Sequence, residues 1–129
     1  MSEAERLSTS KYLSLTTFKK DGTPVATPVW VARDGEHLVV ITDPNSGKVK
    51  RLRNGSDVRL APCDMRGRIT GDSVDGTAVL LDAAGTQRVA GLIGKRYGLL
   101  YKAMTLTDKL RRRTHASVGI EITPGTTTD

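Results

Sequence analysis

Alternating apolar and polar residues predict strands along most of this chain. Residues 12–18, YLSLTTF, alternate leucine with small polar side chains, which is the pattern of a strand with one buried face. The nearly continuous apolar run HLVVIT at 37–42 predicts a strand that is covered on both faces. Three further strands are predicted in the second half of the chain, at 58–63, 74–81 and 116–122.

The segment 23–32 predicts a strand whose position in the sheet is restricted. It is rich in β-forming residues, but Pro24 and Pro28 cannot donate a hydrogen bond to a ladder. We therefore expect this strand at an edge, at a bulge, or with its backbone near Pro28 turned toward a ligand. The Asp-Gly pairs at 21–22 and 34–35 predict the tight turns that join it to its neighbours in a meander.

Two helices are predicted between the strands. Residues 48–54 fit a short helix with Ser46 as its N-cap, and the following Asn54-Gly55 pair is typical of a helix end. Residues 83–95 favour a second helix that two glycines weaken, and 97–104 fit either its continuation or a loop.

Together these elements predict a mainly β fold, a six-stranded antiparallel barrel with one helix after the third strand and one before the last. No GxGxxG motif follows a strand, which argues against a parallel dinucleotide-binding fold. The length of 129 residues fits one domain, 1–129. We expect residues 1–10 to form a short frayed helix or a mobile tail, and 124–129 to form a mobile polar tail.

Charge changes this picture because it is concentrated. The formal net charge is +6, but the stretches 48–68 and 95–113 carry +5 and +6, which leaves −5 for the rest. Such islands indicate an anionic partner, although solvated helix faces would give the same pattern. Aromatic residues make up only 4% of the chain, and no row of stacking residues is present, which argues against nucleic acid.

Soft ligands for a catalytic transition metal are scarce. One cysteine, Cys63, excludes an intramolecular disulfide, and His37 and His115 lie far apart, so we expect no metal site. No catalytic acid or base is evident. The first ten residues contain no apolar core, so we expect a cytoplasmic protein without a membrane segment.

The junction between the third strand and the first helix has the composition of a phosphate cradle. Free backbone N–H groups at a helix start, hydroxyl groups and two cationic side chains would all favour an anion there, although a plain capped surface helix remains the alternative. The residues concerned are Thr42, Ser46, Gly47, Lys48 and Arg51.

Blocks of sequence now show a resemblance to a known family. The motifs LTT, DGTP, TPVWV, TDPNSGKVKRLRN and APCDMRGR occur in that order and resemble the split-β-barrel flavin and deazaflavin oxidoreductases, the pyridoxamine-phosphate-oxidase-like proteins. The similarity is greatest to the coenzyme F420-dependent actinobacterial branch and covers roughly residues 10–123. It implies a split β-barrel homodimer with one cofactor in each of two grooves at the dimer interface.

The resemblance also implies positions for the cofactor. Its phosphate would lie near Thr42, Ser46, Lys48 and Arg51, its ring near Thr27, Pro28, Val29 and Trp30, and a neighbouring wall would be Ala61, Pro62 and Cys63. An acidic cofactor tail would follow basic residues such as Lys50, Arg53 and some of 109–113. On the residues alone, Trp30 fits the barrel core better than a cofactor wall, and Cys63 fits a small buried side chain.

The function that follows is an F420-dependent reductase, in which hydride passes between the deazaflavin and a small organic substrate. An FMN-binding oxidoreductase on the same barrel and a non-catalytic F420 carrier are the alternatives. The sequence does not identify the substrate.

Overall fold

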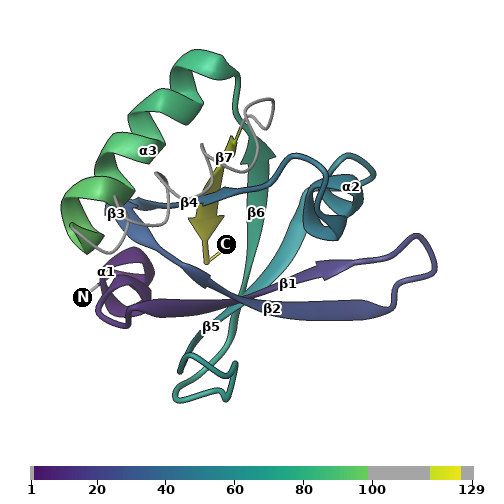
Figure 1. The fold of residues 1–129 in the computed structure, drawn as a ribbon. Helices are drawn as coiled ribbons and strands as arrows, with labels where there is room; N and C mark the ends of the chain where they lie inside the picture. The colour runs from purple at the N-terminus through teal and green to yellow at the C-terminus, as the bar shows by residue number, and fades with distance from the viewer. Residues whose placement is uncertain (1, 99–116, 126–129) are drawn as a thin grey trace.

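A single antiparallel sheet that curls on itself forms the body of the protein (Figure 1). The computed structural model describes residues 2–98 and 117–125. Its strands are β1 (Tyr12–Phe18), β2 (Pro24–Trp30), β3 (Ala32–Asp34), β4 (His37–Thr42), β5 (Asp57–Cys63), β6 (Val74–Leu80) and β7 (Val118–Pro124). Its helices are α1 (Glu3–Ser8), α2 (Gly47–Leu52) and α3 (Ala83–Tyr97). The strand order is β2-β1-β5-β6-β7-β4-β3.

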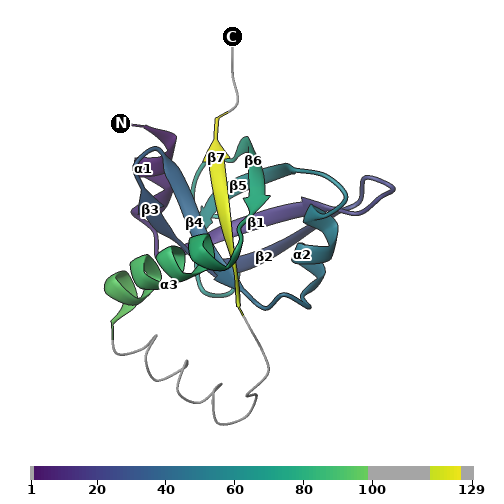
Figure 2. The ribbon, with the colours of Figure 1, turned by 90° about the horizontal axis from the view of Figure 1, so that it is seen from above.

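The sheet has seven strands rather than the six predicted, because the segment 23–32 divides at Val31. Its first part, β2, pairs with β1, and its second part, β3, pairs with β4. The two edges of the sheet are therefore joined by one residue, which gives the curled half-barrel seen from above in Figure 2. Of the three alternatives expected for the proline-containing strand, the structure shows the edge position, which β2 occupies.

The division at Val31 coincides with hydrogen bonds to Tyr97, a residue distant in the sequence. The Val31 N–H donates to the hydroxyl oxygen of Tyr97 at 3.1 Å, and that hydroxyl lies 2.8 Å from the Val31 carbonyl oxygen and 2.6 Å from that of Lys11. A hydroxyl has one proton, so it donates to one of these carbonyls at a time. A side chain at the end of α3 thus takes the place of a neighbouring strand at this residue.

The apolar core fills the inside of the curl. Its fully buried side chains come from β1, β4, β5 and β7, and include Leu13, Leu15, Leu38, Leu60, Ile120 and Ile122. Helix α1 contributes Ala4 and Leu7, both buried, so of the two alternatives expected for residues 1–10 the structure shows the short helix, packed against the core. A second cluster lies between α3 and the outer face of β3 and β4, which is why β4 is covered on both faces as predicted.

Helix α2 matches its prediction in position and in its inward residues, since Val49 and Leu52 are buried. Two details differ. Ser46 occupies the N-cap position, but its hydroxyl makes no capping hydrogen bond. Gly55 has no positive φ, because the chain leaves the helix through Arg53 in right-handed helical geometry and needs no left-handed residue there.

Several expectations concern residues outside the described part of the chain. They include His115, most of the basic island 95–113, and the tail beyond residue 125. Of the region 97–104, the structure describes Tyr97 as the last residue of α3 and Gly98 as its C-cap. Among the helices in the described residues, none is long and apolar enough to cross a membrane.

Gly76 in β6 provides a test of the close packing between β6 and β7. A Cβ atom there would lie 2.7 Å from the Thr123 carbonyl oxygen and 3.2 Å from the Pro124 Cα, both backbone atoms that cannot turn away. We expect Gly76→Ala to lower the free energy of unfolding by about 1–3 kcal/mol. Urea unfolding measures the effect. The matched Gly91→Ala change on α3 meets no atom within 4 Å and should not destabilise the fold.

Candidate functional site

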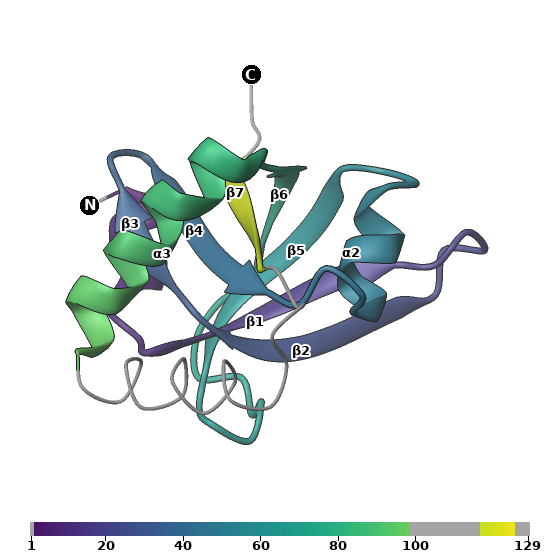
Figure 3. The ribbon, with the colours of Figure 1, turned by 45° about the horizontal axis from the view of Figure 1, so that its top comes forward.

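The cationic cluster that the sequence predicted is built by α2 and the end of β4. Val49 and Leu52 anchor the helix against the core, where it packs on β1 and β6 (Figure 3). Lys48 and Arg51 are three residues apart and therefore lie on one side of the helix. Thr42, half-buried at the end of β4, is paired with Val118 across the ladder to β7.

The guanidinium of Arg51 has a fixed position. Its Nε donates a 2.6 Å hydrogen bond to Oγ1 of Thr17, a fully buried residue of β1. The head group also lies against Gly47, where a Cβ atom would come within 2.7 Å of Nη1. Within residues 2–98 and 117–125, no group accepts a hydrogen bond from Nη1 or Nη2. Two strong donors are thus held in place without an acceptor.

Lys48 adds a second, partly desolvated cation. Burial lowers the pKa of its ammonium group from the usual 10.5, and the charge of Arg51 lowers that pKa further, while Asp43 opposes the shift. Desolvation disfavours the charged form of a lysine, and a neighbouring cation has the same effect. An anion bound between Lys48 and Arg51 would relieve both penalties.

Ser46 adds an unused hydroxyl. Its Oγ atom is buried and has no hydrogen-bond partner among the described residues. Buried polar atoms are nearly always paired, so an orphan of this kind calls for an explanation. Together Ser46, Lys48 and Arg51 offer hydrogen-bond donors and positive charge, which fits the oxygens of a phosphate group.

The predicted ring-binding residues are divided between the two faces of the sheet. Residues that face each other across antiparallel strands point to the same side, and neighbours along a strand point to opposite sides. The register pairs Pro28 with Ser14 and Ser14 with Ala61, and it pairs Trp30 with Tyr12 and Tyr12 with Cys63. The outer face therefore has Pro28, Trp30, Ala61 and Cys63. The inner face has Thr27, Val29 and Pro62.

Trp30 lies outside the barrel core, contrary to the interpretation favoured from its residue type. Its ring stacks on Tyr97 with centroids 4.5 Å apart and an interplanar angle of 6°, within the cluster beneath α3. The reason is the alternation of β2, which places Trp30 on the outer face. One face of the indole is covered by Tyr97, so only the rest of the ring is left to border a cofactor.

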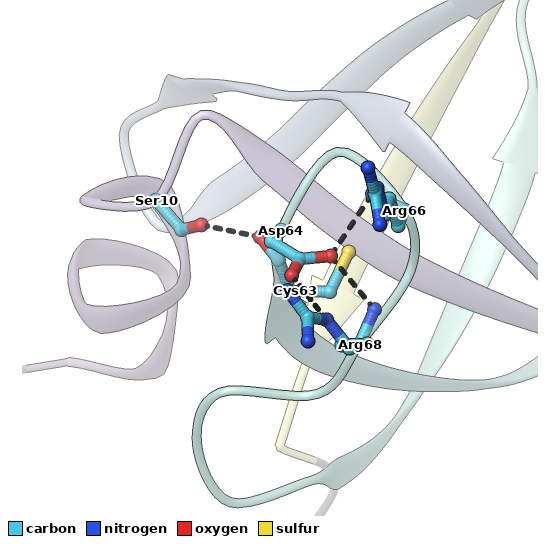
Figure 4. A network of polar contacts seen from close by, with 5 residues as sticks. All are labelled: Ser10, Cys63, Asp64, Arg66 and Arg68. Atoms are coloured by element: carbon cyan, nitrogen blue, oxygen red, sulfur yellow. Dashed lines mark hydrogen bonds and ion pairs between the residues drawn. The ribbon is translucent and has the colours of Figure 1, made fainter.

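Cys63 is a small buried side chain, as expected, and burial followed by the nearby Asp64 charge raises the pKa of its thiol. In the turn after Cys63, two arginines of the basic stretch 48–68 make structural hydrogen bonds. Asp64 accepts hydrogen bonds of 2.9 Å from the backbone N–H groups of Arg66 and Arg68 and from Arg68 Nε (Figure 4). These bonds lower the pKa of the Asp64 carboxyl.

The structure thus separates the basic island into different roles. Arg68 is paired with Asp64, and Nε of Arg59 lies 3.5 Å from Oδ1 of Asp75. Lys50 is exposed on α2. Because Lys50 is two residues from Lys48, it lies on a different side of the helix. Lys48 and Arg51 are the members of the island that the fold brings together with Ser46.

A pocket of about 850 Å³ lies elsewhere, between the β1–β2 hairpin and the loop after α2. Phe18, Lys19, Lys20 and Arg59 line it, and none of the predicted site residues does. Asp57 and Asp75 also line this pocket, so its cations are largely balanced by carboxylates. The α2 cluster, with two neighbouring cations and unused donors, is the stronger candidate for an anion.

Thr17 is the site residue that sequence reasoning missed. Leu13 and Leu15 precede it on the same inner face of β1, so a buried polar residue at that position is unexpected. That departure from an apolar face was the available signal. Its partner Arg51 lies 34 positions further along the chain, which local patterns do not predict.

Comparison with known proteins agrees with this architecture. The profile of the pyridoxamine 5′-phosphate oxidase family matches residues 3–128. A solved structure of a conserved hypothetical protein from Mycobacterium tuberculosis is 25% identical with a TM-score of 0.69, covering 98% of this chain and 82% of that one. None of the curated proteins matches the chain in sequence.

Two more distant structures share the fold. The heme storage protein HutZ from Vibrio cholerae is 16% identical with a TM-score of 0.68, covering 97% of this chain and 89% of that one. An F420 reductase is 19% identical with a TM-score of 0.58, covering 98% of this chain and 96% of that one. At these identities the likeness concerns the fold alone.

Proposed function

Because the chain belongs to the pyridoxamine 5′-phosphate oxidase family, we propose that it is an oxidoreductase with a phosphate-bearing flavin-type cofactor, and that this cofactor is coenzyme F420. The observation that carries the proposal is the cluster of Ser46, Lys48 and Arg51, in which two cations lie beside a buried Ser46 hydroxyl that has no hydrogen-bond partner among the described residues. The resemblance of five sequence blocks to the F420-dependent branch supports the choice of deazaflavin.

The residues fit the phosphate of such a cofactor. Arg51 would present its two Nη groups to two phosphate oxygens, which is the planar geometry that a guanidinium provides. Lys48 would add a point charge, and the buried Ser46 hydroxyl would gain the acceptor that it lacks. Thr42, at the end of β4, would border the same group.

The remaining residues would orient and shield the ring. On the outer face of β2 and β5, Pro28 and Ala61 lie in register with one strand between them, a separation of about 10 Å. A bound reduced deazaflavin supplies a hydride, so the protein needs to place the substrate and exclude water rather than provide a general base. No catalytic acid or base is assigned among the described residues.

We also propose that the protein acts as a homodimer on a small organic substrate. Met65 and Ile69, in the loop between β5 and β6, are 68% and 56% exposed although both are large and apolar. Gly67 of this loop lies near Pro28, since a Cβ there would be 3.8 Å from the proline ring. An exposed apolar surface beside the proposed ring site supports a partner subunit at that place.

FMN is the second candidate, because the cluster contains two cations. FMN ends in a phosphate monoester, a group that carries about −1.5 to −2 charges at pH 7. Lys48 and Arg51 would neutralise it. The phosphate of F420 is a diester with a single negative charge, so charge matching alone favours FMN, whereas the sequence blocks favour F420.

Titration of the purified protein separates these candidates. We expect F420 fluorescence to change saturably on addition of protein, with weaker binding of FMN under the same conditions. Saturable FMN binding with no response to F420 would mean that the cofactor is FMN and not the deazaflavin. Bound reduced F420 should then be oxidised faster than free cofactor by a small electrophilic acceptor such as a quinone. Binding without any acceleration across a panel of acceptors would indicate a carrier.

A further inference from the structure

The Arg51 guanidinium is held by a hydrogen bond to Thr17 and lies beside Gly47, where the lack of a side chain leaves room for it. We propose that Thr17 and Gly47 are positioning residues, which fix the fork of Arg51 so that its two Nη groups form a preformed site for a tetrahedral oxyanion. The inference rests on the proposed function for the identity of the natural anion, the cofactor phosphate. The geometry of the arginine itself does not depend on that assignment.

Thr17 is the first of the two restraints. It follows Leu13 and Leu15 on the inner face of β1 and is fully buried. Burial of a hydroxyl is unfavourable unless a hydrogen bond compensates for the lost water, and Arg51 Nε provides that bond at 2.6 Å. Because Nε is tied to Thr17, rotation about the last bonds of the arginine is restricted. An aliphatic residue here would suit the barrel core and would release the guanidinium.

Gly47 is the second restraint. It is the first residue of α2 and has no positive φ, so the backbone conformation does not require glycine. Glycine is less favourable than alanine within a helix, which makes its presence a cost to be explained. The explanation is the space that the Arg51 guanidinium occupies. A Cβ atom at this position would lie 2.7 Å from Nη1 and 3.4 Å from Nη2 of Arg51, one helical turn away.

The two restraints act on different parts of the same head group. Thr17 holds Nε from the barrel side, and Gly47 leaves space for the Nη side to lie close to the first turn of α2. Arginine has one of the largest side-chain entropies, so a ligand that had to order it would bind more weakly. Lys48 and the unpartnered Ser46 hydroxyl lie in the same first turn. The anion therefore meets donors that are already in place.

Inorganic phosphate is the probe that tests this proposal. Its binding is followed by NMR through the Nε–Hε resonance of Arg51, which is identified by its loss in Arg51→Lys. Thr17→Val keeps the shape of the side chain and removes the acceptor, whereas Thr17→Ser keeps the acceptor. We expect Thr17→Val to weaken phosphate binding about tenfold and Thr17→Ser to change it by less than about twofold. Hydrogen exchange at Nε should be fast in Thr17→Val and slow in Thr17→Ser.

Gly47→Ala tests the second restraint without touching the core. We expect it to weaken phosphate binding about tenfold while helix stability is kept or raised. Gly91→Ala on α3 is the matched control, because a Cβ there meets nothing within 4 Å. It should leave phosphate binding unchanged. Gly47→Ala also keeps the proposal testable if Thr17→Val does not fold.

Three results would overturn the inference. They are a wild-type protein that does not respond to phosphate, a Gly47→Ala variant that binds phosphate as Gly91→Ala does, and equal Nε exchange in Thr17→Val and Thr17→Ser. The proposed function fails separately. If phosphate binding follows the expected pattern but neither F420 nor FMN binds, the positioning role stands and the cofactor assignment falls. If a cofactor binds the wild type and all variants alike, the cofactor assignment stands and the positioning role falls.

Discussion

Replacing Lys48 by methionine should weaken cofactor binding about 10- to 150-fold and, at the same time, make the protein without cofactor more stable. The first effect corresponds to ~1.5–3 kcal/mol, typical of one hydrogen bond to a charged group. The second follows because burial and Arg51 lower the Lys48 pKa, so the fold disfavours the charge that the anion needs. Fluorescence titration and a thermal melt at pH 7 measure the two effects.

The pH dependence has a defined sign. The folded-state pKa of Lys48 lies below its usual 10.5, so between these two values the unfolded chain binds more protons and stability rises with pH. The advantage of Lys48→Met is therefore full below the lowered pKa and disappears above about pH 10.5. Cofactor affinity of the wild type should fall as pH rises through the lowered pKa, because the ammonium group is lost.

Lys11→Met is the matched control, since Lys11 is exposed and lies before β1. It should change neither the affinity nor the melting temperature. The interpretation of Lys48 would be wrong if Lys48→Met bound the cofactor as tightly as Lys11→Met does. It would also be wrong if Lys48→Met melted at a lower temperature than the wild type.

Tyr97→Ala should cost about 2–4 kcal/mol of the free energy of unfolding, somewhat less than the loss of a fully buried aromatic side chain because Tyr97 is half-buried. The change removes the ring stacked on Trp30 and the hydroxyl that bonds Val31. Tyr97→Phe keeps the stacking and leaves the Val31 N–H without its partner, for an expected loss of about 1–3 kcal/mol. Trp30 is the single tryptophan, so its fluorescence follows urea unfolding directly.

Tyr12→Phe is the control for the hydroxyl of Tyr97. Tyr12 is half-exposed on β1, and among the described residues its hydroxyl has no hydrogen-bond partner. Its substitution should change the free energy of unfolding by less than about 0.5 kcal/mol. Equal stability of Tyr97→Phe and Tyr12→Phe would show that the hydroxyl does not hold the β2–β3 junction.

Local patterns predicted the elements whose cause is local. The bounds of β1 and β4 follow from alternation and from a continuous apolar run, and both Asp-Gly turns place a glycine at positive φ, Gly22 at 91° and Gly35 at 63°. The break at Val31 was not predictable in this way, because it depends on the Tyr97 hydroxyl, 66 positions away. The same holds for Leu7, whose burial depends on strands that come later in the chain.

The same distinction between local and tertiary causes applies to the candidate site. Lys48 and Arg51 share a helix face by spacing alone, so their proximity could be predicted from the sequence. The separation of Thr27 from Pro28 onto opposite faces also follows from strand alternation. The pairing of Pro28 and Ala61 through Ser14 does not, because it needs the register of three strands. The contact between Thr17 and Arg51 likewise needs the tertiary fold.

The most direct test of the account is a crystal structure of the protein with its cofactor. We expect the phosphate oxygens within about 2.7–3.2 Å of Lys48 Nζ, of the Arg51 Nη groups and of Ser46 Oγ. A phosphate bound instead in the pocket beside Lys19, Lys20 and Arg59, with Lys48 and Arg51 free of it, would contradict the account.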